Sequence, residues 1–281
     1  MARALTIACL QTAPVADMEA ARDAALTLAE EAVAAGAGLL ALPEYCGGLR
    51  TENAAIAAPA AEEAEHPVLL GLAALARSRG VWVLVGSVAV PGPDGKILNR
   101  GVTIAPDGQT VARYDKIHMF DIQLSETEVY RESARVVPGG AAALIEAAGA
   151  RIGHTICYDL RFPSLYRDLA QAGAEILAVP AAFTKKTGEA HWHVLNRARA
   201  IENGAFVVSP CAVGPIPGGG ESYGHSLIVD PWGVVLADGG TAPGVVLAEI
   251  DLDAVAEARA KIPSLTHDRA YSPATPHRDV A

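Results

Sequence analysis

Three residues with chemically useful side chains stand where predicted β-strands end. Glu44 follows the apolar residues 39–42, Lys116 follows a hairpin strand at 110–114, and Cys157 follows a predicted buried strand at 152–156. Open α/β sheets bind their ligands at the ends of inner strands. All three positions obey this rule, which makes one shared site a hypothesis for the structure to test.

Together these residue types would support nucleophilic catalysis by a thiol. A cysteine attacks as the thiolate and needs a base or a nearby cation to reach that form. Glu44 would accept the proton, while Lys116 would lower the thiol pKa and stabilise an oxyanion. Attack on a carbonyl or nitrile carbon would give a covalent thioester or thioimidate, which water then releases.

Each of these residues, taken alone, also has an ordinary structural interpretation. A single cysteine after an apolar strand is more often a small buried hydrophobe, and we keep that interpretation for Cys9, Cys46 and Cys211. An isolated Glu44 would be a surface or capping carboxylate, and an isolated Lys116 a solvated charge.

Other catalytic patterns have weaker support. Five histidines raise the possibility of a metal site: His118, His154, His191, His193 and His225. However, His191 and His193 are poorly spaced for one helix face, and no HExxH motif is present, so the sequence predicts no metal. The local context of a papain-like cysteine and the Gly-x-Ser-x-Gly motif of serine hydrolases are both absent.

The segments around these residues alternate between predicted strands and helices. Asp17 can cap a helix that begins at Met18, and residues 81–90 form the strongest predicted strand. Residues 115–140 form a long polar loop, and residues 226–250 are predicted to close the fold as a meander of strands. This order indicates one α/β domain with a mixed sheet.

Composition excludes several classes of protein. The chain has 281 residues and a formal charge of −10, which disfavours binding to duplex nucleic acid. No segment reaches the ~20 apolar residues of a membrane-spanning helix. The four cysteines are far apart and no signal peptide is recognised, so we expect free thiols and a cytoplasmic protein. Residues 272–281 are polar and are predicted to be a loose tail or an arm on a partner subunit.

Eight short motifs resemble those of the nitrilase superfamily of carbon–nitrogen hydrolases. Four surround the candidate residues: Leu-Pro-Glu-Tyr at 42–45, Tyr-Asp-Lys-Ile-His-Met-Phe-Asp at 114–121, Tyr-Arg-Glu-Ser at 130–133 and Cys-Tyr-Asp-Leu-Arg-Phe-Pro at 157–163. The others lie at 190–192, 197–202, 223–226 and 230–233. The resemblance covers residues 4–271, and the motifs occur in the order typical of the superfamily.

The resemblance implies a fold and a set of roles. The fold would be a four-layer α-β-β-α sandwich with mixed sheets, formed by a carbon–nitrogen hydrolase domain at 1–271 with a tail at 272–281. Glu44 would be the general base, Lys116 the oxyanion-stabilising lysine and Cys157 the nucleophile, with Glu132 as a second glutamate beside them. The backbone N–H of Tyr158 would complete the oxyanion hole. A homodimer is implied, and neither a metal nor an organic cofactor.

The motif at 157–163 resembles the branch that contains ω-amidases and deaminated-glutathione amidases. In that branch Arg161 would grip a substrate carboxylate, a geometry that suits guanidinium, although an internal salt bridge with Asp159 is an equal alternative. Phe183 and Thr187 match pocket positions. Lys185 and Lys186 nearby would attract an acidic substrate, with a solvated loop as an equal alternative. The predicted function is therefore an amidase acting on the terminal amide of a small carboxylate-bearing substrate. Hydrolysis of N-carbamoyl amines or nitriles, or a non-catalytic binding role, are the alternatives.

Overall fold

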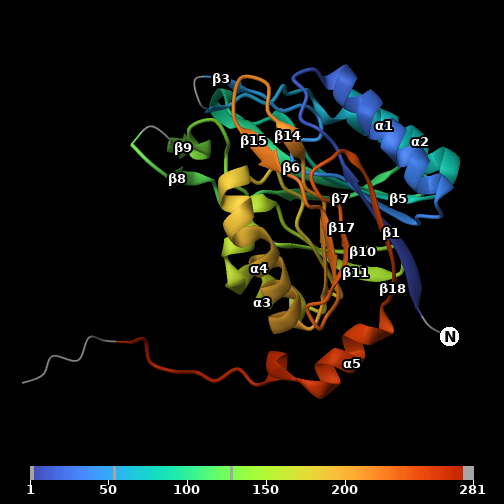
Figure 1. Ribbon diagram of the computed structural model, residues 1–281, viewed down its shortest axis with the longest axis vertical. Coiled ribbons are helices and arrows are strands. Elements are labelled where there is room, and N and C mark those ends of the chain that lie inside the picture. Colours follow the sequence, from blue (N-terminus) through green and yellow to red (C-terminus); the bar gives the residue numbers. More distant parts are fainter. Residues whose placement is uncertain (1–2, 53–54, 127–128, 275–281) are drawn as a thin grey trace, which may run out of the picture.

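Two six-stranded β-sheets form the centre of the part of the chain described by this computed structural model, residues 3–52, 55–126 and 129–274 (Figure 1). The first has the order β18-β1-β2-β5-β6-β7, with β1 at Ala4–Gln11, β2 at Leu39–Ala41, β5 at Trp82–Pro91, β6 at Ile97–Ile104, β7 at Thr110–Asp115 and β18 at Gly244–Asp251. The second has the order β10-β11-β12-β13-β16-β17, with β10 at Ala143–Ala147, β11 at Ala150–His154, β12 at Ile176–Ala178, β13 at Phe206–Ser209, β16 at Leu227–Val229 and β17 at Val235–Asp238. Each sheet has parallel inner pairs and antiparallel outer pairs.

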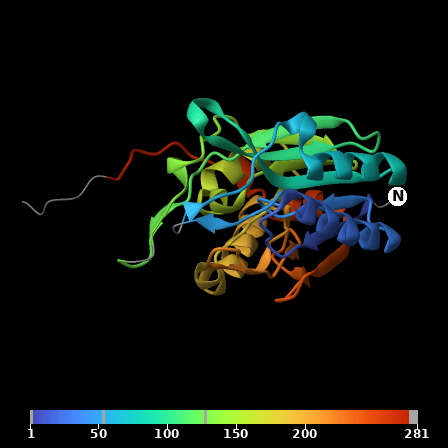
Figure 2. The same cartoon turned by 90° about the horizontal axis from the view of Figure 1, so that it is seen from above.

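Helices cover the outer face of each sheet. Helices α1 (Met18–Ala34) and α2 (Pro67–Arg79) lie side by side on the first sheet, and α3 (Pro163–Gln171) and α4 (Lys185–Asn203) on the second (Figure 1). Figure 2 shows the two helix pairs on opposite sides of the strands. The architecture is thus the α-β-β-α sandwich that the sequence resemblance implies.

Alanine-rich packing explains how α1 approaches the first sheet closely. The Asp17 side chain caps the helix by accepting from the backbone N–H groups of Glu19 and Ala20, at 3.0 and 2.9 Å. The buried face is formed by alanines at helical spacing, Ala21, Ala25, Ala29 and Ala32. These small side chains leave little space between helix and strands.

A separate apolar layer joins the two sheets face to face. It includes Ile7 and Leu84 from the first sheet and Ile152, Ile176 and Val208 from the second, all buried. Alternate side chains of the same strands point outward and pack beneath the helices, as the twofold repeat of a strand requires. Inner strands therefore consist of continuous apolar segments.

The last strand departs from the predicted meander. Strands β16 and β17 pair as expected, but β18 crosses to the first sheet and pairs antiparallel with β1 from Ala4↔Asp251 to Gln11↔Gly244. The prediction of a continuous closing meander was therefore wrong for this strand. The alternation of residues in a strand does not identify its partner, and β18 covers the edge of β1, which would otherwise be unpaired.

Short elements surround one end of the sandwich. The long loop contains a hairpin of β8 (Asp121–Gln123) and β9 (Val129–Arg131), followed by a 3-10 helix at Glu132–Ala134. Two further pairs are distant in the chain but line the same pocket: β3 (Thr51–Glu52) with β4 (Ala55–Ile56), and β14 (Val213–Pro215) with β15 (Glu221–Tyr223). These pairs supply much of the wall of the pocket described below.

The last α-helix among the described residues is α5 (Asp253–Lys261), and its Val255 packs into the apolar layer between the sheets. Of the predicted tail at 272–281, residues 272–274 are exposed and extended away from the body (Figure 1), and residues 275–281 lie outside the described part. Among the described residues, none of the helices has the length and apolar character needed to cross a lipid bilayer.

Candidate active site

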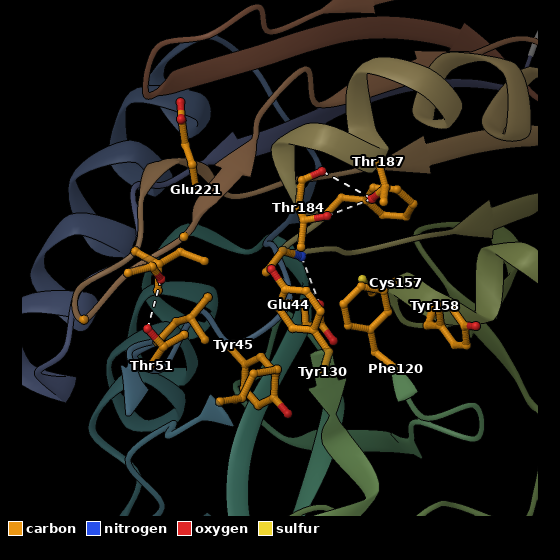
Figure 3. Close-up of a pocket in the computed structure, with 18 of the residues that line it drawn as sticks. Glu44, Tyr45, Thr51, Phe120, Tyr130, Cys157, Tyr158, Thr184, Thr187 and Glu221 are labelled. Carbon is orange, nitrogen blue, oxygen red and sulfur yellow. Dashed lines mark hydrogen bonds between the residues drawn. The ribbon is translucent and has the colours of Figure 1, made fainter. Parts of the chain in front are cut away.

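Glu44, Lys116 and Cys157 meet in one pocket although they come from different sheets. Glu44 lies just after β2 and Lys116 directly after β7, both in the first sheet, whereas Cys157 follows β11 in the second. All three side chains line the same cavity, and Figure 3 shows Glu44 and Cys157 near its centre. The rule that strand ends form the site thus brings the three predicted residues together.

The backbone at Cys157 turns sharply and is held in a strained conformation. Cys157 has φ 49°, in the left-handed region that disfavours residues with a β-carbon, and it begins a 3-10 helix at Cys157–Arg161. Its N–H donates to the Pro180 carbonyl at 2.9 Å. Such strain persists only where the surroundings enforce it, and it is common at functional sites. The turn carries the thiol into the pocket.

A buried network of charges surrounds the Lys116 ammonium. Nζ donates to Glu44 Oε1 at 2.8 Å, and to the two carboxylate oxygens of Glu132 at 3.0 and 2.9 Å. Each of the three side chains is less than 5% exposed. A lysine between two carboxylates is compensated in charge, which burial demands, and its position is fixed by three hydrogen bonds.

Electrostatics favour a charged lysine and a protonated resting thiol. Burial alone would lower the Lys116 pKa, but the carboxylates of Glu132 and Glu44 outweigh it and raise that pKa well above its ordinary value. Burial raises the pKa of the Cys157 thiol, Glu44 raises it further, and Lys116 opposes both. A thiol in this state needs a base at the moment of attack, and the Glu44 carboxylate is beside it.

Two residues that were not predicted hold the carboxylates in place. Asn99, in β6, donates from Nδ2 to Glu44 Oε1 at 2.9 Å and to Glu132 Oε1 at 3.3 Å. The Tyr45 hydroxyl donates to Glu132 Oε1 at 3.3 Å. Glu44 also accepts from the Ala182 N–H at 2.9 Å. Asn99 is fully buried, so its amide needs polar partners, but neither its burial nor its direction can be seen in the sequence.

Asp159 joins the segment of the lysine to that of the cysteine. Its carboxylate accepts from the Tyr114 hydroxyl at 2.7 Å, from the His118 N–H at 3.0 Å and from the Ile156 N–H at 2.8 Å. His118 Nδ1 lies 2.7 Å from the same carboxylate. Asp159 therefore does not form the salt bridge with Arg161 that was weighed as an alternative.

Arg161 lies instead over aromatic rings at the side of the pocket. Its guanidinium carbon is 5.8 Å from the ring centroid of Tyr158 and 5.4 Å from that of Phe183. Its Nη2 atom is 3.3 Å from His191 Nδ1. The cation is thus beside the cavity rather than among the described side chains that line it.

The pocket has a volume of about 250 Å³ and is mainly apolar. Tyr158, Phe183 and Thr187 line it, and the Thr187 hydroxyl is 2.8 Å from that of Thr184 (Figure 3). Glu221 lies at one side, paired with Lys185 at 3.0 Å. A cavity of this size suits a small molecule whose polar end reaches the buried charges.

The chain matches the carbon-nitrogen hydrolase family over residues 6–260 and belongs to that family. This confirms the resemblance inferred from the motifs, and the chain is a hydrolase of carbon–nitrogen bonds with amidase function. It is 41% identical over 249 residues to a protein of Synechocystis named deaminated glutathione amidase, which covers 85% of this chain and 89% of the relative. The protein of that name from Rattus norvegicus is 39% identical over 247 residues, covering 86% and 75%.

Solved structures of related proteins share the fold of this chain. The C. elegans NitFhit protein has a TM-score of 0.86 and 32% identity, covering 95% of this chain and 65% of that longer chain. Nit3 of Saccharomyces cerevisiae, described as a member of branch 10 of the nitrilase superfamily, has a TM-score of 0.82 and 26% identity, covering 95% and 97%.

Proposed function

We propose that this protein hydrolyses the terminal amide of a small carboxylate-bearing substrate, either deaminated glutathione or an α-keto-acid ω-amide, to a carboxylate and ammonia. The observation that carries the proposal is the buried Lys116 ammonium between Glu44 and Glu132, in the same pocket as Cys157. The relatives named deaminated glutathione amidase support this substrate class.

The proposed reaction has two stages. First, the Cys157 sulfur attacks the amide carbon while Glu44 accepts the thiol proton, and Lys116 with the Tyr158 N–H stabilises the oxyanion. Glu44 then returns the proton to the leaving nitrogen, so that ammonia departs and a thioester remains. In the second stage Glu44 takes a proton from water, whose oxygen attacks the thioester. The carboxylate leaves and the proton returns to Cys157.

The proposed binding residues surround the rest of the substrate. Phe183 would contact its apolar atoms and the Thr187 hydroxyl a polar group, since both line the cavity. Arg161 would bind the carboxylate, which requires its guanidinium to turn from the rings of Tyr158 and Phe183 toward the pocket. The movement would replace the 3.3 Å contact with His191 and the two ring contacts by a charge-assisted pair with the carboxylate.

The direct test is a screen of ammonia release. The purified chain would be given α-ketoglutaramate, deaminated glutathione, simple neutral amides, N-carbamoyl compounds and nitriles. We expect the highest kcat/KM for one of the two carboxylate-bearing amides. Preferential release of CO₂ from N-carbamoyl compounds, or preferential turnover of nitriles, would replace this proposal with another activity of the same family.

We also propose a cytoplasmic homodimer. The four cysteines are free, as expected for a reducing compartment. Large apolar side chains are exposed on α4 and on the turn that joins β16 to β17, namely Val194, Ile201, Trp232 and Val234. These residues supply the apolar surface that a stable dimer buries. Light scattering on the purified chain measures the mass directly, and a monomer at micromolar concentration would contradict the dimer.

A further inference from the structure

Two histidines and an aspartate converge outside the active site. His193 belongs to α4, His225 lies two residues before β16, and Asp238 ends β17. Their candidate ligand atoms all lie within 4.8 Å of one another. His193 Nε2 is 3.0 Å from Asp238 Oδ2, and His225 Nδ1 is 2.8 Å from Asp238 Oδ1. Three separate segments of the chain thus direct a nitrogen or oxygen atom toward one point.

The spacing is close to that of a metal site. Nitrogen and oxygen ligands bind Zn²⁺ at about 2.0–2.2 Å, so in a tetrahedron they are roughly 3.3 Å apart. The contacts of Asp238 with the two histidines are only a few tenths of an ångström shorter than this spacing. The three side chains are 23–34% exposed, which leaves room for the small rotations needed and for water on the ion.

The backbone holds His225 in place for this role. Its φ is 51°, in the left-handed region, and its N–H donates to the Gly240 carbonyl at 2.7 Å. Its carbonyl accepts from the buried Trp192 indole at 2.7 Å. Asp238 Oδ1 also accepts from the Gly240 N–H at 2.9 Å, an outer contact of the kind that orients metal-binding carboxylates.

We propose that His193, His225 and Asp238 bind a divalent transition-metal ion of the zinc class, with water completing a tetrahedron. Two imidazoles and one carboxylate form a ligand set that suits such ions. The present hydrogen bonds from the imidazoles to Asp238 do not oppose binding. Each neutral imidazole can carry its proton on the other ring nitrogen and present a lone pair to the ion.

The ion would connect the wall of the substrate pocket to the second sheet. Helix α4 carries Thr187 near its start and His193 nearly two turns later, while His225 lies just before β16 and Asp238 ends β17. Trp192, beside His193, packs against Phe183 with ring centroids 5.0 Å apart. The bound ion therefore stabilises this wall without contacting substrate, so its role is structural and its loss leaves the catalytic groups in place.

Metal titration of the complete chain tests the proposal. The chain would be prepared without a polyhistidine tag, freed of metal with a chelator, and carry Cys157→Ala so that the active-site thiol cannot bind the ion. Titration with Co²⁺ would follow the visible absorption of tetrahedral cobalt, and Zn²⁺ would then displace it. We expect one saturable site per chain and a melting temperature that rises with Zn²⁺.

Matched variants test whether the measured Co²⁺ binding occurs at this cluster. Loss of an outer contact alone weakens metal affinity by about 10–100-fold, so His193→Gln and Asp238→Asn should each weaken binding by at least about tenfold. His191→Gln, on the same helix but outside the cluster, should change it by less than about twofold. Equal affinity in all variants, or no saturable Co²⁺ binding at about 100 µM, would overturn the proposal and identify a hydrogen-bonded cluster only.

Discussion

Lys116 donates to both carboxylate oxygens of Glu132, at 3.0 and 2.9 Å, and so has more contacts with Glu132 than with Glu44. Glu132 also accepts from the Phe120 N–H at 2.6 Å. The second glutamate is therefore the principal anchor of the lysine. It lies in a 3-10 helix that follows the β8–β9 hairpin, within residues 115–140, which the sequence predicts to be a loop.

Glu132→Gln should therefore lower kcat more than it raises KM. The amide keeps the shape of the side chain but removes one of the charges that raise the Lys116 pKa. Lys116 would then be displaced from the oxyanion, and by analogy with the loss of an oxyanion donor we expect kcat to fall about 100-fold. Glu63→Gln is the control, because Glu63 is also ion-paired but lies outside the pocket. Similar kcat values for both variants would refute the anchoring role.

Cys157→Ala should reduce ammonia release to the background rate while leaving the circular dichroism spectrum unchanged. No other side chain in the proposed mechanism can form the thioester. Cys46→Ala is the matched control, because Cys46 is also buried, its pKa is raised to about 12, and its sulfur only donates to the Ser87 carbonyl. Retained turnover in Cys157→Ala would disprove the nucleophile assignment.

The sequence supported prediction of the site because three of its residues follow predicted strands. The ends of these strands can be recognised in the sequence where a β-prone segment stops. Asn99 escaped notice because it lies within β6, where only the fold decides that its side chain points toward Glu44. The partner of β18 was missed for a related reason, because pairing depends on which edge remains uncovered.

Nor does the sequence indicate that His193 and His225 both contact Asp238. The spacing of His191 and His193 along one helix is unfavourable for a shared ion. The structure instead pairs His193 with Asp238, which lies 45 residues later in the chain. A local sequence pattern indicates only which residues share a face of one helix or strand. This cluster instead depends on how α4 packs against β16 and β17.

Asp159→Asn should slow catalysis and also slow alkylation of Cys157 by iodoacetamide. The carboxylate accepts bonds from Tyr114, His118 and Ile156, and an amide cannot accept all of them. We expect a loss of stability of about 1–3 kcal/mol from the unsatisfied buried groups, with kcat at least about tenfold lower. Tyr114→Phe, which removes one of these bonds, should have a smaller effect. Unchanged alkylation in Asp159→Asn would mean that Asp159 contributes to stability alone.

Arg161→Ala should raise KM mainly for amides that carry a carboxylate. A guanidinium–carboxylate pair is a strong charge-assisted contact, so we expect an increase of about tenfold for such substrates. Neutral amides of similar length serve as the comparison, and Arg161→Lys should recover only part of the loss because ammonium cannot form the bidentate contact. An equal rise in KM for neutral amides would assign Arg161 to the packing of Tyr158 and Phe183 instead.

His154 should make the fold sensitive to acid. Its ring is fully buried, stacks on Tyr114 at 5.6 Å, and lies so close to β6 that a β-carbon on Gly101 would be 2.4 Å from it. Burial lowers the pKa of His154 from 6.5 to about 4, outweighing the Gly86 carbonyl and Asp159, which favour the charged form. Between these two pH values the unfolded chain binds the additional proton, so the free energy of unfolding falls as the pH is lowered. The loss begins near pH 6.5 and reaches about 3 kcal/mol once the pH is below 4.

Urea unfolding at several pH values between 4 and 7 measures how the free energy of unfolding changes with pH. This pH dependence, rather than the absolute stability, reports the contribution of His154. His154→Asn leaves a cavity and should be less stable at pH 7, but it removes the titrating group. Its unfolding free energy should therefore depend less on pH than that of the unaltered chain, by about 3 kcal/mol across the interval. His267→Asn changes an exposed histidine and should retain the full dependence. Identical slopes for His154→Asn and the unaltered chain would show that His154 is not the source of the acid sensitivity.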